Sequence, residues 1–322
     1  IVHLGWALRG AVMAYVVAAG VSTLASMALM IPRVSLRFAP AVVGPLMRFG
    51  APLVVAGLSA WLLNVGDRYM LKWLSETVAV GLYDFGSRVG GIVNLLFVQS
   101  FQLAFAVAGL RQFDEGRLDL HRSAMRHYAV WTGWFVLALS VFAEEGMTLL
   151  VTVLGVDPFY LGIKSVVLPV AAGFWFYGLY HVAANVLYGL ERTRTIAGFV
   201  LAAAVLNLVL NFFLIPRLGV VGAAVATTVA FATLAIGTVL MTERLRPIGF
   251  DRRVLVAVVV VVVALWAVSS QLEAMPDLPR ILLRLLLVAL FGPLILASRT
   301  FGVADLTRGL GFLRPEVRDG SN

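Results

Sequence analysis

An acid, a base and two amides lie on one face of a long apolar segment, and their types and spacing allow ion pairing and hydrogen bonding inside a membrane. A helix turns about 100° per residue, so within residues 78–110 the side chains of Asp84, Arg88, Gln99 and Gln102 fall in an arc of about 60°. Asp84 and Arg88 are four residues apart and can pair. The stripe is either a hydrogen-bonded seam between helices or a wall of an aqueous cavity, and its length of about 27 Å favours the cavity.

Polar groups also interrupt two other apolar segments. Asp67 and Arg68 lie near one end of the apolar segment at residues 49–73, the end predicted below to face outward. Anchoring at the membrane surface is there the alternative to a role in binding. Tyr180 and Asn185 share one broad face of the apolar segment at residues 163–190. An aromatic belt or a contact between helices is the alternative to a role in binding. An ionisable group in hydrocarbon is costly unless it has a partner, water or a function. These four residues are therefore further candidates for a binding site.

The sequence contains no pattern typical of an enzyme. It has no HExxH zinc motif, no glycine-rich phosphate loop and no GxSxG nucleophile motif. With no cysteine, disulfides and thiolate metal sites are excluded. Glu144 and Glu145 form a carboxylate pair without a flanking acid, base or metal ligand, which predicts a solvated loop. We expect no catalytic residue, no metal site and no cofactor.

The composition is that of an integral membrane protein. Hydrophobic residues make up 61% of the 322 and charged residues 13%, with a mean hydropathy of +0.95. A soluble domain would carry about a quarter charged residues. The net charge of +8 comes from arginines in short clusters between apolar runs, a pattern typical of membrane loops rather than of nucleic-acid binding.

Nine apolar runs of roughly the length that spans a bilayer predict an all-α, multi-pass protein. They are Leu8–Met30, Phe49–Trp73, Val78–Leu110, Ala124–Phe142, Ile163–Leu190, Ile196–Ile215, Val220–Met241, Val254–Leu272 and Ile281–Ala297.

The basic residues predict the orientation. Loops after the first, third, fifth and seventh spans, together with the tail, hold 17 of the 25 Lys and Arg residues. The alternate loops hold four, namely Lys72, Lys164, Arg217 and Arg280. By the positive-inside rule, the C-terminus is cytoplasmic and Ile1 lies outside. The predicted location is a cytoplasmic membrane.

Two groups of motifs resemble a known family. The first comprises FGAP at residues 49–52, DRYML at 67–71 and VGLY at 80–83; the second comprises NLVLN at 207–211 and IPRLGVVGAAVAT at 215–227. In order and spacing they resemble the polysaccharide transporter family of the multidrug/oligosaccharidyl-lipid/polysaccharide exporter superfamily. Its best-known members are flippases of O-antigen-type and teichuronic-type lipid-linked oligosaccharides.

The resemblance, which covers most of residues 1–242, implies two six-helix lobes facing each other across a central cavity. The implied organisation is the last span of an N-terminal lobe (1–32), a cytoplasmic linker (33–48), a C-terminal six-helix lobe (49–242), two additional spans (243–300) and a cytoplasmic tail (301–322). Five earlier spans of the N-terminal lobe are then expected to lie outside this sequence.

The resemblance also implies export of an undecaprenyl-diphosphate-linked glycan, such as a lipopolysaccharide O-antigen unit, by alternating access. The candidate substrate contacts are Arg88 for the phosphates, with Asp84 holding it while the cavity is empty, Gln99, Gln102, Asn185 and Tyr180 for the sugars, and Asp67 and Arg68 near the outer end. Expected partners are the lipid-linked oligosaccharide, membrane lipids, a polysaccharide polymerase and glycosyltransferases, with no nucleic acid.

Two alternatives stay open. A cation-coupled multidrug or small-molecule exporter of the same superfamily needs an unpaired acidic residue deep in the C-terminal lobe, and none is apparent in the sequence. A membrane-bound glycan-assembly enzyme or scaffold needs a catalytic carboxylate in a large outer loop. The longest outer loop, residues 144–160, is short and partly apolar.

Overall fold

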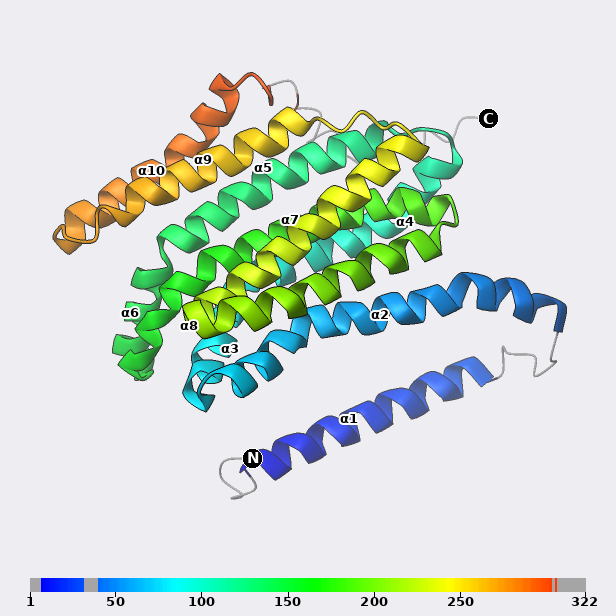
Figure 1. The fold of residues 1–322 in the computed structure, drawn as a ribbon, viewed down its shortest axis with the longest axis horizontal. Coiled ribbons are helices and arrows are strands. Elements are labelled where there is room, and N and C mark those ends of the chain that lie inside the picture. Colours follow the sequence, from blue (N-terminus) through cyan, green and yellow to red (C-terminus); the bar gives the residue numbers. More distant parts are fainter. Residues whose placement is uncertain (1–6, 32–39, 303–304, 306–322) are drawn as a thin grey trace. The chain divides into compact units, whose positions relative to one another are not determined.

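The computed structural model describes residues 7–31, 40–302 and 305, and all elements in this part of the chain are helices (Figure 1). The all-α prediction is therefore confirmed for the described residues. The helices are α1 Ala7–Met30, α2 Pro40–Leu74, α3 Thr77–Gly90, η2 Asn94–Gln99 (a π-helix), α4 Ser100–Asp114, α5 Asp119–Val141, α6 Ala143–Leu154, η3 Pro158–Ile163 (a 3-10 helix), α7 Lys164–Gly189, α8 Thr193–Leu245, α9 Arg252–Ser270 and α10 Asp277–Ala297.

The chain forms two units, residues 1–48 and 49–322. The first unit contains α1, a span by length and hydropathy, and the first turns of α2. The predicted linker at 33–48 and the predicted tail at 301–322 lie in large part outside the described residues. The second unit holds every candidate site residue.

Six of the described helices are long and apolar enough to cross a membrane, and up to eight spans result when each of two bent helix pairs counts as one. The first bent pair covers residues 78–114 and has a 43° break, so the helix predicted over 78–110 is interrupted. The second covers residues 119–153, with a 53° break between α5 and α6.

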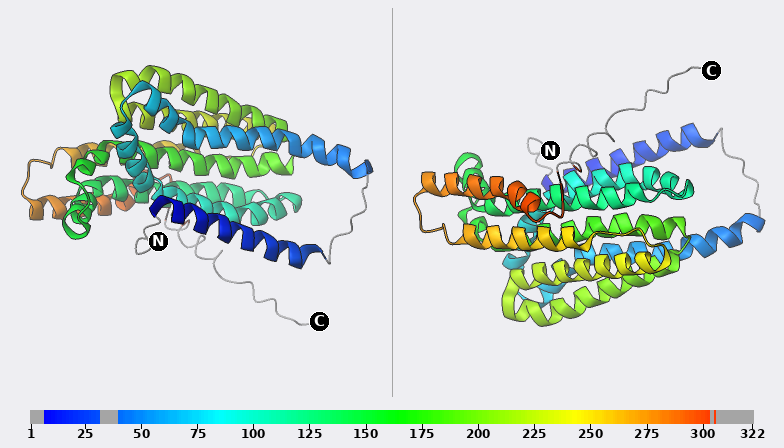
Figure 2. Two further views of the ribbon diagram at one scale, coloured as in Figure 1. Left: turned by 90° about the horizontal axis from the view of Figure 1, so that it is seen from below. Right: turned by 90° about the horizontal axis from the view of Figure 1, so that it is seen from above.

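α8 supplies the ninth span because its 53 residues fold back on themselves (Figure 2). A straight helix of that length would extend about 80 Å, more than twice the hydrocarbon thickness of a bilayer. Gly219 has φ 57° and ψ −132°, a conformation that glycine reaches without a Cβ clash, and Pro216 removes a backbone donor just before it. With each half of α8 counted as a span, the described part of the chain has nine spans, the number predicted from the sequence.

The two halves of α8 approach each other closely at Gly222. A Cβ on this residue would lie 2.4 Å from the carbonyl oxygen of Leu214, a backbone atom that cannot rotate away. We expect Gly222→Ala to lower the free energy of unfolding by about 1–3 kcal/mol, as overpacking does elsewhere. Thermal unfolding in detergent measures the loss. Gly198→Ala on the same helix is the matched control, because nothing lies within 4 Å of its Cβ position. An equal loss in both variants would contradict this explanation.

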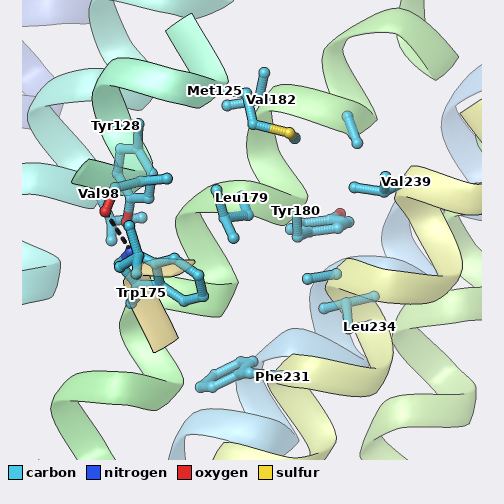
Figure 3. Packing of buried hydrophobic residues seen from close by; sticks show 14 of the residues in the cluster. Val98, Met125, Tyr128, Trp175, Leu179, Tyr180, Val182, Phe231, Leu234 and Val239 are labelled. Atoms are coloured by element: carbon cyan, nitrogen blue, oxygen red, sulfur yellow. Dashed lines mark hydrogen bonds between the residues drawn. The ribbon is translucent and has the colours of Figure 1, made fainter. Parts of the chain in front are cut away.

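α7 lies in the middle of the second unit and contacts α3, α4, α5, α6 and α8 (Figure 1). In Figure 3 the side chains of Trp175 and Leu179 on α7 lie between Tyr128 of α5 and Phe231 of α8. Trp175 Nε1 donates to the carbonyl oxygen of Ala129 at 2.9 Å, so the polar atom of a buried indole is satisfied. The hairpin of α9 and α10 packs on α5 (Figure 2).

Loops that the charge pattern assigns to one side of the membrane contact each other at one end of α5, and loops assigned to the other side do so at its other end. At the start of α5, Arg122 Nη2 donates to the carbonyl oxygen of Ile248 at 2.7 Å. Just after its end, Glu145 pairs with Arg284 near the start of α10. This grouping agrees with the predicted alternation of the loops, while the side that each end faces stays a prediction.

Candidate functional site

Two arginines share the carboxylate of Asp84 on the surface of the second unit. Arg88 Nε lies 2.8 Å from Asp84 Oδ2, which confirms the pair expected from their spacing. Arg68 Nε lies 2.8 Å from Asp84 Oδ1, a contact between α2 and α3 that spacing could not predict. Arg68 also donates to the carbonyl oxygen of Asn64 at 2.8 Å and to Ser87 Oγ at 3.1 Å. We call Arg68, Asp84 and Arg88 the arginine cluster.

The two arginines of this cluster are held very differently. Arg68 uses all three nitrogens of its guanidinium in contacts within the protein, and its side chain is 30% exposed. Arg88 uses only Nε, its side chain is 75% exposed, and its two terminal nitrogens meet no acceptor within the described residues. With two arginines and one aspartate, the cluster carries a formal charge of +1. Arg88 is thus a cation with two parallel donors available for an anion.

Gln99 and Gln102 do not continue the stripe as one straight helix. The chain breaks after Gly90, and residues 94–99 form a π-helix with i→i+5 hydrogen bonds, so the 100° spacing assumed from the sequence does not hold there. Both glutamines are exposed on the second unit. No hydrogen bond joins either of them to the arginine cluster in the described part of the chain.

Asp67 is buried in the interior of the second unit, so its side chain does not reach out to anchor the helix at a membrane surface, which corrects the anchoring alternative. The residue is 2% exposed. Its carboxylate accepts a hydrogen bond from the hydroxyl of Tyr83 and another from Thr227 Oγ1 at 3.0 Å. Asn207 Nδ2 donates to Thr227 Oγ1 at 3.1 Å, and Asn211 Nδ2 donates to Asn207 Oδ1 at 3.0 Å. We call these five residues the buried polar network.

The buried polar network has the composition of a small cation site. Asp67 Oδ1 and Asn211 Oδ1 are buried and have no hydrogen-bond donor within the described residues. Carboxylate, amide and hydroxyl oxygens are the ligands that hard cations prefer, and a proton on Asp67 would also remove the unpaired charge. The described part of the chain contains no group of three or more His, Cys, Asp or Glu side chains that could hold a metal ion. Asp67 is thus a buried acidic residue with no ion-pair partner within the described residues, a feature that the sequence alone did not reveal.

Asn185 and Tyr180 pack α7 against its neighbours. Asn185 Oδ1 lies 3.0 Å from Nε2 of His121, and Asn185 Nδ2 donates to the carbonyl oxygen of Ala106 at 3.3 Å. Tyr180 is buried beside Leu234 and Val239 (Figure 3). Neither side chain presents an open surface in this conformation. The placement favours helix packing over the sugar-binding role expected from the sequence.

Glu144 and Glu145 were predicted to lie in a solvated loop, and this prediction is wrong: both are in the first turn of α6. Arg284 of α10, only 3% exposed, donates to Glu145 Oε1 and to Glu144 Oε2 at 3.4 Å. Arg280 and Lys164 lie at the edge of this group. The signal that could have revealed the cluster was Arg284 itself, because an arginine within an apolar span requires a buried partner.

We expect Arg284→Gln to destabilise the protein by about 3–5 kcal/mol, because two partly buried carboxylates would lose their main cationic partner. Thermal unfolding in detergent, combined with the yield of monodisperse protein, measures the effect. Lys164→Gln is the matched control: this lysine contacts the same Glu144, but its side chain is 43% exposed, so about 1 kcal/mol or less is expected. Equal losses in the two variants would show that burial of Arg284 is not what matters.

Comparison with known proteins agrees with this architecture. The model of the family described as polysaccharide biosynthesis protein matches residues 1–105, and that of the lipid II flippase MurJ family matches residues 161–274. No sequence among the curated proteins matches the chain. Among solved structures, the chain is similar to a lipid II flippase MurJ in an inward closed conformation, with a TM-score of 0.63 and 13% identity.

The similarity to that MurJ structure covers 86% of this chain and 59% of the other chain, so this chain spans about 59% of the length of its structural relative. At 13% identity the likeness shows the fold. The two family matches fall on the regions that carry the FGAP and IPRLGVVG motifs. Fold, family matches and motifs agree: the chain is similar to lipid-linked flippases of the multidrug/oligosaccharidyl-lipid/polysaccharide exporter superfamily.

Proposed function

We propose that the full-length protein moves a polyprenyl-diphosphate-linked oligosaccharide from the inner to the outer leaflet of the bacterial cytoplasmic membrane. The observation that carries this proposal is Arg88, an exposed arginine in a cluster with a charge of +1, whose terminal nitrogens have no acceptor within the described residues. The two matching families, named for lipid II flipping and for polysaccharide biosynthesis, support a lipid-linked precursor as the substrate class.

The contacts of the arginine cluster allow Arg88 to leave Asp84 and bind an anion. A diphosphate entering a low-dielectric cavity needs a cation with parallel donors, which the free edge of Arg88 provides. When Arg88 turns toward a phosphate, Asp84 keeps its contact with Arg68, so no carboxylate is left without a partner. The exposed amides of Gln99 and Gln102 are our candidates for hydroxyl groups of the sugar. An O-antigen-type glycan, with a polymerase and glycosyltransferases as partners, remains part of the proposal.

The buried polar network supports coupling of this movement to a monovalent cation or a proton. A carboxylate that is 2% exposed and has one oxygen without a donor within the described residues favours binding of a positive charge. The same observation favours the second candidate function, a cation-coupled exporter of small molecules. The glycan-assembly enzyme receives less support, because the carboxylates of Glu144 and Glu145 are bound by Arg284.

The test uses the full-length protein in proteoliposomes that contain a fluorescent polyprenyl-diphosphate oligosaccharide. We expect protein-dependent movement of the label between leaflets, followed by quenching from outside, and slower movement of the corresponding monophosphate lipid. A cationic dye such as ethidium is assayed in parallel. Transport of ethidium without movement of the diphosphate lipid would overturn the proposal and favour the small-molecule exporter.

A further inference from the structure

Tyr83 contacts both the buried polar network and the arginine cluster. Its hydroxyl donates to Asp67 in the interior. Its ring lies beneath the guanidinium of Arg68, with Arg68 Cζ 5.9 Å from the ring centroid. Tyr83 is itself 1% exposed, so its ring is enclosed by the protein.

The contacts form two adjacent rungs between α2 and α3. Asp67 bonds to Tyr83, and the next residues along each helix, Arg68 and Asp84, bond to each other. Consecutive residues on a helix point about 100° apart, which places the first rung inside the unit and the second at its surface. Because each helix carries both rungs on one stretch of backbone, a displacement of one rung displaces the other.

We propose that Tyr83 couples the charge state of the buried polar network to anion binding at Arg88. The inference rests on the proposed function and extends it. A hydrogen bond to an ionised carboxylate is about twice as strong as one to a neutral group. Neutralising Asp67 therefore weakens the hydrogen bond that the Tyr83 hydroxyl donates to it. The ring then shifts beneath Arg68, which transmits the change to Asp84 and so to Arg88. Neutralisation also removes one negative charge near the cluster, so the two binding events favour each other.

The experiment measures binding of farnesyl diphosphate to the purified full-length protein by calorimetry, in NaCl and in N-methylglucamine chloride at equal ionic strength. We expect Na⁺ to lower the apparent Kd of the wild type at least about fivefold, within the usual range of coupling between sites. In Tyr83→Phe this ratio is expected to fall below about twofold. The same ratio should appear in reverse, as an effect of farnesyl diphosphate on the affinity for Na⁺.

Tyr128→Phe is the matched control, because it also removes the hydroxyl of a buried tyrosine, here one that donates to the carbonyl oxygen of Phe174 at 3.3 Å. Its coupling ratio should equal that of the wild type. Arg68→Lys is a second variant. It keeps the charge but cannot make all three guanidinium contacts, with Asp84, Asn64 and Ser87, so its ratio should fall as in Tyr83→Phe. Thermal unfolding shows that each variant is folded.

The outcomes separate this inference from the proposed function. If farnesyl diphosphate binds in a manner that requires Arg88 but Tyr83→Phe keeps the full cation dependence, the coupling is overturned and the proposed function stands. If binding does not require Arg88, the proposed function fails, and the coupling with it. If binding depends on pH rather than on Na⁺, and Tyr83→Phe abolishes that dependence, the coupling stands with a proton as the bound charge.

Discussion

Arg88→Ala is expected to lower the rate of lipid-linked diphosphate transport by the full-length protein about 100-fold or more, while the protein remains inserted and abundant. Two charge-assisted hydrogen bonds to a phosphate contribute about 3 kcal/mol together, which corresponds to about a hundredfold in affinity. Arg88→Lys should retain part of the activity, because it keeps the charge but loses the parallel donors. The flipping assay in proteoliposomes measures both variants against equal amounts of reconstituted protein.

Arg111→Ala provides a closely matched control. Arg111 pairs through Nε with Glu115, four residues further along the chain, and its side chain is 77% exposed, much as Arg88 pairs with Asp84 and is 75% exposed. It lies at the other end of the bent segment, in a predicted cytoplasmic loop. Its removal should leave transport unchanged within about twofold, in line with the small contribution of exposed ion pairs.

A double variant decides whether Arg88 binds substrate or only neutralises its neighbour. Asp84→Asn combined with Arg88→Gln removes one charge of each sign and leaves Arg68 as the single cation of the cluster. We expect this protein to be folded and inactive, because Arg68 is fixed by Asn64 and Ser87 and cannot replace Arg88. Full transport by the double variant would reject the phosphate-binding role and leave a structural ion pair.

The membrane spans are predictable because each depends on a property of local sequence. About 20 apolar residues bounded by charges or breakers define a span whatever its neighbours do. α8 illustrates this: Pro216 and Gly219 mark the end of one apolar run and the beginning of the next, and the helix is interrupted by the non-helical conformation of Gly219. The π-helix at residues 94–99 has no comparable signal in the sequence. Because its residues do not follow the 100° spacing of a regular helix, Gln99 and Gln102 do not continue the predicted stripe.

The candidate site was only partly predictable because its contacts join separate helices. The Asp84–Arg88 pair follows from spacing on one helix, whereas Arg68 reaches Asp84 from 16 residues away on α2. A hydropathy profile averages over a window and does not distinguish the neighbouring residues Asp67 and Arg68, yet one side chain points inward and the other outward. Which of the two is buried depends on how α2 packs against α8, where a Cβ on Gly66 would lie 3.6 Å from Leu208.

The second large effect is expected for Asp67→Asn, which should lower transport at least about tenfold without destabilising the protein. Asparagine has nearly the same shape as aspartate, accepts the same bonds from Tyr83 and Thr227, and removes a buried charge that has no cationic partner within the described residues. Folding stability should therefore stay the same or rise by about 1–2 kcal/mol. A loss of transport in a protein that is at least as stable as the wild type would identify the charge of Asp67, rather than its packing, as the functional property.

A direct readout of the same charge is the effect of Na⁺ on thermal unfolding. A ligand that binds only the folded state raises the unfolding temperature with its concentration, so the wild type should gain stability as Na⁺ replaces N-methylglucamine. Asp67→Asn should lose that dependence, whereas Asp114→Asn, a change at an exposed position at the end of α4, should keep it. If Asp67→Asn transports at the wild-type rate and keeps its response to Na⁺, the carboxylate serves only to join α2 to α3 and α8, and the energy source for transport must act elsewhere in the full-length protein.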